Sequence, residues 1–527
     1  MNETAVLDAQ TRVQGLLPKP SRVELGSGYV TLATELVASG PAEWVMAAAD
    51  LLRPGTGLTV VVGDDARLVI ERADLAEGAY SLSVGDDGVR IESAGLSGVI
   101  NAVATLRQLL PAWVNAPAPL PGADLDVPRV RIDDEPRFSW RGMHLDVARH
   151  FMPLPFLYRV VDLLAMYKFN VLHLHLTEDQ GWRFEVKKWP KLTTIGAVRS
   201  ETRFPNWADG DGTPHGGFYS QDQLRALVGY AKGRGVTIVP EVDVPGHVRA
   251  LLAAYPQFGD GSGEHGVATG FGVFNEVLHL GAETVAMVED VFSELLDVFD
   301  SEIIHIGGDE CPTSQWLAND EAAELASSRG LAGPEQLQAW LTKHLVRFLS
   351  ERGRRVVGWD EIIEHGDVEN AVIMSWRGHE PGVEALSRGY DVIMAPNHST
   401  YFDYYQSGSS REECSIGGDL PWQKVAEFDP ELGVEEEHLP RLLGVQGQLW
   451  TEYMPTAARV EYMMLPRAAV LAEVAWRGRA SADDLAERLR MNEVRLDAAG
   501  VNYRPLDGPR PWQEGGTGRY ARGESQF

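Results

Sequence analysis

The chain has 527 residues, which is too long for one small core and indicates two domains, one of them large. Its hydrophobic share of 44% and charged share of 23% are ordinary for a globular protein, while its formal net charge is -29. Such a charge argues against nucleic acid and anionic membranes as partners, and a neutral ligand would tolerate it best.

The chain shows no sign of a disulfide framework or of a targeting segment. It has two cysteines, Cys311 and Cys414, and we expect Cys311 to serve packing because no base is visibly paired with it. The first residues contain neither the basic nor the apolar segment of a leader peptide. No window reaches the roughly 18 uninterrupted apolar residues of a membrane-spanning helix. We therefore expect a cytoplasmic protein, unless a leader has been removed.

Residues 20 to about 110 alternate short strand-like runs with turns, which predicts a small α+β domain. Strands are expected at 58–62, 80–84 and 89–92. A hairpin turn at 85–88 should join the last two strands. A helix should follow, with apolar residues at helical spacing from Val99 to Leu110 and Ser97 as its candidate N-cap. No catalytic cluster is visible in this domain.

Five prolines between residues 111 and 128 indicate a linker or a wrapped connection, and we place the domain boundary near residue 130. The predicted organisation is an N-terminal α+β domain with its linker at 1–130, a catalytic domain at 131–500 and a tail at 501–527. An amphipathic helix at about 481–499 precedes this tail, which is polar, rich in Gly and Arg, and expected to be mobile.

Beyond residue 130 one pattern recurs: a short apolar run ends in polar or aromatic residues, and a helical stretch follows. There are eight such runs, at 140–146, 171–176, 236–243, 303–306, 355–359, 372–376, 392–395 and 443–450. Eight strand-helix units over about 350 residues predict an α/β fold of the (β/α)8 TIM barrel type. Long loops rich in turn formers at 200–220 and 404–437 should shape a binding cleft.

A barrel of this kind carries its active site just after the carboxyl ends of its strands. The residues at these exits are mostly acids and aromatics: Arg149, His150, Asp179, His247, Asp309, Glu310, Trp359, Asp360, Glu361, Trp376, Tyr401, Asp403, Trp450 and Glu452. Carboxylates and aromatic rings at nearly every exit are hard to explain by coincidence, so these residues are the candidate site.

The most informative exit follows the apolar run at 303–306, where two glycines precede Asp309 and Glu310. Two neighbouring carboxylates in a partly dry site cannot both ionise freely, so the pKa of one should rise, which suits a general acid. Taken alone, the segment is equally consistent with a strand that ends in a solvated acidic turn.

Three tryptophans at strand exits favour a sugar as the ligand. The flat indoles of Trp359, Trp376 and Trp450 could stack on the apolar C–H face of a sugar ring, although each could also cap the barrel core. Glycoside hydrolysis fits acids and aromatics together best. Its ordinary form uses two separated carboxylates, and adjacent Asp309 and Glu310 cannot easily act on opposite sides of one bond, so a different nucleophile is implied.

A rival interpretation rests on His173 and His175. Metal-dependent amidohydrolases place an H-x-H pair at a barrel strand end, with further histidines at later strands. Here the pair sits within its strand and the later exits carry tryptophans, so we interpret both histidines as core or supporting residues. His247, three residues beyond its strand, is either a hydrogen-bonded structural residue or a group that tunes the acid near Asp179 and Glu310.

Four segments resemble the β-N-acetylhexosaminidases of glycoside hydrolase family 20, and the likeness covers most of the chain. They are residues 141–151, 170–183, 241–247 and 305–310, of which the last two are the most specific. A small α+β domain ahead of the barrel also resembles the arrangement of this family.

The resemblance implies the missing nucleophile, because these enzymes use the 2-acetamido group of the substrate. By this likeness Glu310 would be the acid and base, Asp309 would hold the acetamido N–H, and Tyr401 would bind its carbonyl oxygen. The acetamido methyl would be enclosed by Trp359, Trp376 and Trp450. The hydroxyls of the terminal sugar would be bound by Arg149, Asp403 and Glu452. Asp179 and His247 would form a relay behind the acid.

The resemblance thus implies an exo-acting, retaining hydrolase of terminal β-linked GlcNAc, with an oligosaccharide or glycan as substrate and neither metal nor cofactor. A metal-dependent amidohydrolase and a carbohydrate-binding barrel without activity remain as alternatives. The choice between GlcNAc and GalNAc, the natural source of the substrate and the oligomeric state stay open.

Overall fold

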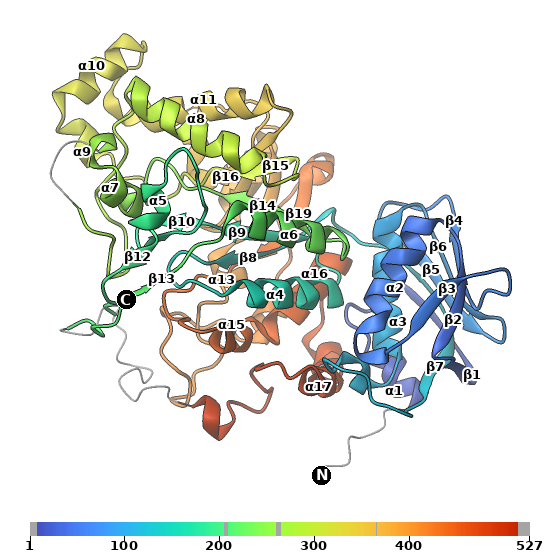
Figure 1. The fold of residues 1–527 in the computed structure, drawn as a ribbon. Coiled ribbons are helices and arrows are strands. Elements are labelled where there is room, and N and C mark those ends of the chain that lie inside the picture. The colour runs from blue at the N-terminus through green and yellow to red at the C-terminus, as the bar shows by residue number, and fades with distance from the viewer. Residues whose placement is uncertain (1–7, 205–208, 260–264, 365, 515–527) are drawn as a thin grey trace.

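The computed structural model describes residues 8–204, 209–259, 265–364 and 366–514, which form an N-terminal sheet domain and a barrel domain (Figure 1). The N-terminal domain consists of α1 (Ala9–Gln14), β1 (Arg22–Leu32), β2 (Glu35–Ser39), α2 (Ala42–Thr56), β3 (Thr59–Val62), β4 (Leu68–Arg72), β5 (Tyr80–Gly85), β6 (Gly88–Ser93), α3 (Leu96–Leu109) and β7 (Leu125–Asp134). Its sheet has the order β1-β7-β5-β6-β4-β2-β3, and the helices α2 and α3 lie together on one side of it (Figure 1).

The predicted hairpin and helix of this domain are confirmed, but the predicted cap is wrong. β5 and β6 pair antiparallel with Gly85 opposite Gly88, as the turn residues indicated. α3 begins one residue before Ser97, its N-cap is Gly95, and the Ser97 hydroxyl donates to the carboxylate of Glu77 instead. A serine caps a helix only if its own backbone is extended, and Ser97 already lies within the helix, which the sequence does not reveal.

The proline-rich stretch runs into the N-terminal sheet. Its last proline, Pro128, lies in β7, which stands between β1 and β5, so the expected boundary near residue 130 falls inside a strand. Pro128 pairs with Tyr29 next to an irregularity in β1 and lies beyond the residues that β5 pairs, where a missing N–H costs little. The chain crosses to the barrel between Asp134 and Trp140.

The eight predicted barrel strands are confirmed. They are β8 (Trp140–Asp146), β9 (Val171–His175), β14 (Thr237–Glu241), β15 (Ile303–His305), β16 (Arg355–Trp359), β17 (Val372–Ser375), β18 (Asp391–Met394) and β19 (Leu442–Gly447). They close in the order β14-β15-β16-β17-β18-β19-β8-β9, and all neighbouring pairs are parallel. The barrel architecture puts every strand exit on one face.

Helices and short strands surround the barrel strands. The helices are α4 (Leu154–Met166), α5 (Lys191–Thr194), α6 (Gln221–Lys232), α7 (Arg249–Ala254), α8 (Ala282–Leu296), α9 (Ser314–Leu317), α10 (Asp320–Ser328), α11 (Leu337–Ser350), α12 (Glu380–Ser387), α13 (Asn397–Thr400), α14 (Trp422–Ala426), α15 (Ala457–Met464), α16 (Arg467–Arg477) and α17 (Ala482–Ala498). The short strands are β10 (Thr177–Glu178), β11 (Gly181–Trp182), β12 (Val198–Arg199) and β13 (His215–Gly216). Between β16 and β17 a 3-10 turn at Asp360–Ile363 stands where a helix was expected.

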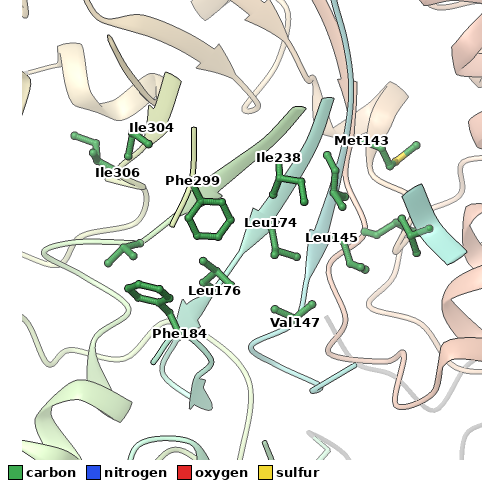
Figure 2. Close-up of a cluster of buried hydrophobic side chains, with 14 of the residues drawn as sticks. Met143, Leu145, Val147, Leu174, Leu176, Phe184, Ile238, Phe299, Ile304 and Ile306 are labelled. Atoms are coloured by element: carbon green, nitrogen blue, oxygen red, sulfur yellow. The ribbon is translucent and has the colours of Figure 1, made fainter. Parts of the chain in front are cut away.

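Alternation along the strands separates an apolar layer outside the barrel from an interior that holds both a smaller apolar cluster and polar side chains. In β9 and the residue after it, Leu172, Leu174 and Leu176 belong to the large apolar cluster, while His173 and His175 lie on the opposite face of the strand. Figure 2 shows part of this apolar layer beside the strands: Met143, Leu145, Val147, Leu174, Leu176, Phe184, Ile238, Phe299, Ile304 and Ile306. Because the main core lies between strands and helices, the interior can carry charged groups toward the strand exits.

A buried ion pair joins the two domains. The Lys168 ammonium lies 2.9 Å from Oδ2 of Asp134, which also accepts a hydrogen bond from Tyr80. Oδ1 of Asp134 accepts from the indole of Trp476 in α16 at 2.9 Å. Because Asp134 and Lys168 are both buried, separating them would leave an uncompensated buried charge and cost free energy. The ion pair therefore fixes β7 against the barrel.

The C-terminal part of the chain packs against both domains. The predicted helix at 481–499 is confirmed as α17, and Arg495 in it donates to the carbonyl of Gly15 at 2.7 Å. Residues 501–514 of the expected mobile tail instead pack: Val501 and Tyr503 are buried, and Gln513 donates to Tyr503 O. The rest of the tail lies outside the described residues. No helix in the described ranges combines the length and the apolar composition that a membrane span needs.

Candidate active site

The adjacent acids stand on a sharp turn at the end of β15. Asp309 and Glu310 follow Gly307 and Gly308, whose φ angles of 68° and 96° lie in the region that glycine adopts without strain. A Cβ at position 307 would lie 1.8 Å from Oδ1 of Asp243. No other amino acid therefore fits at position 307 in this backbone, and the turn presents both carboxylates on the exit side of the barrel.

The two acids differ in environment. The Asp309 side chain is 13% exposed and that of Glu310 41%, so the site opens to solvent at Glu310. Burial raises the pKa of Asp309. One pKa of the pair thus rises as expected, but at the residue assigned to the acetamido group, whereas the acid role was assigned to Glu310. Within the described chain, Oδ1 of Asp309 has no hydrogen-bond partner. A buried carboxylate oxygen in that condition is suited to accept a hydrogen bond from a ligand.

The residues expected to form a relay, Asp179 and His247, lie behind the acids, together with a further carboxylate. His247 Nε2 lies 3.7 Å from Glu310 and 3.8 Å from Asp309. On its other side Nδ1 donates to Glu178 at 2.7 Å and to Asp179 at 3.2 Å. Burial alone would lower the pKa of His247, but the adjacent Glu178 and Asp179 raise it well above its usual range. His247 is therefore held as a cation behind the pair.

The interior of the barrel carries histidines around Glu241. His173 and His305 lie 3.0 Å from its carboxylate, and His175 also donates to it. This confirms the interpretation of His173 and His175 as buried supporting residues. Ligand atoms of His144, His173 and Glu241 lie within 4.8 Å of one another, so this group has the spacing to hold a cation.

The residues expected to bind sugar hydroxyls gather around Arg149. Its Nη2 lies 3.2 Å from Glu178, its Nε 4.0 Å from Glu452, and its guanidinium 4.7 Å from the ring centre of Trp450. Burial raises the pKa of Asp403 well above its usual range and also raises that of Glu452. Among the described residues, Oδ1 of Asp403 and Oε2 of Glu452 have no hydrogen-bond partner. These buried acceptors fit a polyhydroxylated ligand.

The aromatic candidates form a connected wall. The ring centres of Trp359 and Trp450 are 5.8 Å apart, those of Tyr401 and Trp376 are 6.1 Å apart and nearly parallel, and Tyr401 lies 6.4 Å from Trp450. The indole of Trp359 donates to Glu241 at 3.0 Å, which fixes its plane. Trp359, Tyr401 and Trp450 are buried and Trp376 is partly buried against them, so the four rings form one apolar cluster at the strand exits.

Trp376 is held by a residue that was not assigned a role from the sequence. Its indole N–H donates to both oxygens of Glu361, at 3.1 and 3.0 Å. Burial, together with the nearby Asp309, raises the pKa of Glu361 to about 8. Glu361 stands in the 3-10 turn after β16, and its place at a strand exit was the only signal that could have identified it.

Glu178 and Asp243 were also missed as parts of the site. Glu178 lies beside Asp179 in sequence, and Asp243 belongs to the 241–247 motif, so both were within segments already singled out. Oδ1 of Asp243 accepts from the backbone N–H of Gly308 at 2.9 Å, which ties one strand exit to the next. Cys311 packs against the apolar core, as expected, and burial raises the pKa of its thiol.

The closed parallel barrel, the acids at its exits and the aromatic wall define a glycoside hydrolase of the TIM-barrel class. Residues 138–479 match the catalytic domain of glycosyl hydrolase family 20, and residues 13–135 match domain 2 of the same family. The chain therefore belongs to glycosyl hydrolase family 20. This membership decides against the metal-dependent amidohydrolase that the H-x-H pair suggested.

Relatives that are similar to this chain are named as β-hexosaminidases. A β-hexosaminidase of Porphyromonas gingivalis is 38% identical over 88% of this chain, which spans 58% of the length of that protein. A β-hexosaminidase of Vibrio furnissii is 35% identical over 89% of this chain and 77% of its own length. The crystal structure of an exo β-N-acetylglucosaminidase from Vibrio harveyi in complex with N-acetylglucosamine is 30% identical, with a TM-score of 0.82 over 94% of this chain and 78% of that chain.

Proposed function

We propose that this chain is an exo-acting β-N-acetylhexosaminidase that removes terminal β-linked GlcNAc from the non-reducing end of oligosaccharides or glycoconjugates. The observation that carries the proposal is the adjacency of Asp309 and Glu310 beside one histidine. In glycosidases that use two protein carboxylates, the two groups lie on either side of the glycosidic bond. They are about 5–5.5 Å apart in enzymes that retain the configuration at C1 and about 6.5–9.5 Å apart in enzymes that invert it. Neighbours on one turn do not easily flank a bond, so a nucleophile other than this pair is implied, and in family 20, to which the chain belongs, the 2-acetamido group of the substrate would supply it.

In the first step Glu310 donates its proton to the glycosidic oxygen. The acetamido carbonyl oxygen attacks C1 from the opposite face, the bond from C1 to the leaving oxygen breaks, and the aglycone leaves as an alcohol. The sugar remains as an oxazolinium ion. In the second step the Glu310 carboxylate removes a proton from water, the water oxygen attacks C1, and the acetamido group is restored. Two inversions at C1 retain its configuration.

Asp309, Tyr401 and the tryptophans would make the acetamido group an effective nucleophile. Oδ1 of Asp309, which has no partner in the described chain, would accept the acetamido N–H, and the Tyr401 hydroxyl would donate to the carbonyl oxygen. The wall of Trp359, Trp376 and Trp450 would enclose the methyl group. Holding an intramolecular nucleophile in place can supply on the order of 7–11 kcal/mol of the barrier.

Arg149, Asp403 and Glu452 would bind the hydroxyls of the terminal sugar. The unpartnered buried oxygens of Asp403 and Glu452 suit hydroxyl donors, while the Arg149 guanidinium suits a hydroxyl acceptor. Because these three side chains are largely buried, they would close the site beyond the terminal ring and make the enzyme exo-acting.

The test is release of 4-nitrophenol from its β-GlcNAc derivative, compared with its β-glucose derivative, each with and without EDTA. We expect turnover of the acetamido sugar alone, unaffected by chelation. Comparable turnover of the glucoside would indicate a protein nucleophile and contradict substrate assistance. Loss of activity in EDTA would direct attention to His173 and His144, and sugar binding without turnover would indicate a binding protein. The β-GalNAc derivative, run in parallel, tells whether the orientation of O4 matters to Arg149 and Glu452.

A further inference from the structure

A cavity of about 560 Å³ lies apart from the acid pair, and segments far apart in the sequence meet around it. Besides His150, its lining comes from residues 202–204, 211–215, 413–414, 453–462 and 502–513. Of the described residues, none of those assigned above to hydrolysis or to the terminal sugar lines it. His150 and Tyr453 do, and they directly follow Arg149 and Glu452, so the cavity adjoins that side of the site. Its volume is typical of small-molecule sites, which hold about 300–1,000 Å³.

One tryptophan of the lining, Trp512, is held in solvent. It is 76% exposed, although it stands in a 3-10 turn that is fixed on both sides. Before it, Arg510 donates to Asp497 at 2.9 Å, and after it, the buried Gln513 donates to Asn502 at 2.8 Å. An indole kept in water loses the free energy that burial would give it. Because its backbone is fixed, this ring is a preformed platform for an apolar ligand face, and it stands at the mouth of the cavity.

Further rings line the buried part of the cavity. The ring centres of Phe204 and Tyr453 are 5.7 Å apart, and His150 stacks on Phe204 with 6.3 Å between the ring centres. Tyr453 and His150 are both more than nine-tenths buried. The cavity therefore offers aromatic surface in its open and its buried parts, which suits a ligand with apolar C–H faces such as a sugar ring.

Polar groups in the lining lack partners within the protein. The Tyr453 hydroxyl and Nη1 of Arg459 have no hydrogen-bond partner in the described chain, and both residues are more than nine-tenths buried. Thr202, Thr213 and Asn502 add hydroxyl and amide groups to the same lining. Buried polar atoms are nearly always paired in proteins, so a ligand or an ordered water in the cavity would complete them. Hydroxyl groups of a ligand can both donate and accept such bonds.

The charges of the lining disfavour an anion. Arg459 is neutralised by Glu413, whose carboxylate lies 3.2 Å away, and Asp211 adds a negative charge. Burial, together with the nearby Arg199, lowers the pKa of His215 to about 3 and that of His150 well below its usual range, so neither is charged at neutral pH. The lining thus has no net positive charge, on a chain whose formal net charge is -29. An uncharged ligand fits it best.

We propose that this cavity is a second carbohydrate-binding site, which takes a short neutral oligosaccharide with one sugar ring stacked on Trp512. The inference goes beyond the proposed function and does not depend on it, because no residue assigned to hydrolysis contributes to the described lining. For the proposed hydrolase, a glycan held there would stay beside the active site between rounds of cleavage, which raises its effective concentration at the acids.

The experiment follows the indole signals of 15N-labelled tryptophan by NMR while a sugar is added. Chitotriose is added to the Glu310→Ala chain, in which it stays intact, and cellotriose, which has no acetamido group, is added to the wild type. The signal that disappears in Trp512→Ala belongs to Trp512. We expect at least one of the two sugars to shift this signal in a saturable manner.

Two variants show whether the cavity itself binds the sugar. Ala458→Gln extends a side chain of the lining from an exposed position of α15, so it should obstruct the cavity and leave the core intact. We expect it to weaken binding, measured from the Trp512 signal, at least about fivefold. Leu317→Ala removes another exposed apolar side chain, in α9 and outside the described lining, and should leave the affinity unchanged.

The proposal fails if neither sugar moves the Trp512 signal. It also fails if Ala458→Gln leaves the affinity unchanged, since the sugar would then only stack on the open surface, or if sialyllactose binds as tightly as the neutral sugars. A Trp512 signal that moves with protein concentration and not with sugar would mean that a second copy of the chain covers the cavity, which also overturns the proposal.

These results are separable from a failure of the proposed function. The indole signals of Trp359, Trp376 and Trp450 report on the candidate active site, and release of 4-nitrophenol reports on turnover. A chain without hexosaminidase activity in which sugar still shifts Trp512 would support the second site alone. An active chain in which Trp512 never responds would refute the second site and leave the proposed function standing.

Discussion

Asp309 and Glu310 are neighbours in sequence, yet their carboxylates lie at nearly the same distance from His247 Nε2, 3.8 and 3.7 Å. One imidazolium thus faces both acids, while only Glu310 is substantially exposed. The arrangement suits two carboxylates that act on different parts of one sugar ring, and variants at the two positions should fail in different ways.

Glu310→Ala should remove the proton donor. We expect turnover of a chito-oligosaccharide, whose leaving group is poor, to fall by about 10²–10⁴-fold, while the first step on an activated aryl GlcNAc derivative is largely spared. Steady-state rates on the oligosaccharide and burst kinetics on the 2,4-dinitrophenyl derivative separate the two. An equal loss on both substrates would refute the assignment of Glu310 as the acid.

Asp309→Asn should impair the chemical step far more than binding. The amide can still accept one hydrogen bond, but it no longer carries the charge that would orient the acetamido N–H and stabilise the cationic intermediate. We expect kcat to fall on the order of 10²-fold with a much smaller change in the Kd of GlcNAc, measured by calorimetry. A variant with normal kcat and weakened binding would show that Asp309 only holds the sugar.

Glu361 should make the stability of the protein depend on pH. Its pKa of about 8, raised first by burial and then by Asp309, exceeds the ordinary value of 4.5, so the folded state keeps a proton that the unfolded chain releases. The resulting stability is present at low pH and is lost as pH rises from about 4.5 to about 8. Glu361→Gln lacks this titration, so its Tm relative to the wild type should rise between pH 5 and pH 8.5. The exposed Glu364→Gln is the matched control and should show a constant difference.

Asp134→Ala should destabilise the protein strongly through the domain interface. It would leave the buried Lys168 ammonium without its counter-charge, which costs about 3–5 kcal/mol. Asp133→Ala changes the adjacent carboxylate, which is 35% exposed and lies beside Arg131 at the surface, and should cost less than about 1 kcal/mol. Urea unfolding of both variants gives the comparison. Equal losses in the free energy of unfolding would mean that the buried Asp134–Lys168 pair stabilises the protein no more than the surface carboxylate does.

The barrel was predictable because the strand pattern is local. Each apolar run is short, ends in polar or aromatic residues and needs no knowledge of its neighbours, so all eight strands and the side of the site could be identified. The boundary was not predictable in the same way. The prolines before β7 suggested a linker, and only the pairing of β7 with β1 and β5 shows that this strand belongs to the first sheet.

The candidate site was predictable as a set of strand exits but not as a network. Glu178 contacts His175 at the end of its own strand, but Arg149 and His247 come from other exits, and their distances from Glu178 depend on barrel closure. Glu361 likewise depends on Trp376, which a 3-10 turn brings within hydrogen-bonding distance. In a single sequence such acids stand beside residues that are more obvious candidates. The sequence cannot show which charged side chains they contact in the folded protein.

The turn at Gly307 has a consequence for attempts to redesign this enzyme. Because even a methyl group there would overlap the Asp243 carboxylate, a mutant library should leave position 307 unchanged. Altered acceptor preference, including a shift from hydrolysis toward transfer of the sugar to another alcohol, would have to be sought on the open side beside Glu310. The loops beside Glu310 can be randomised, whereas the turn that positions Asp309 and Glu310 does not tolerate substitution at position 307.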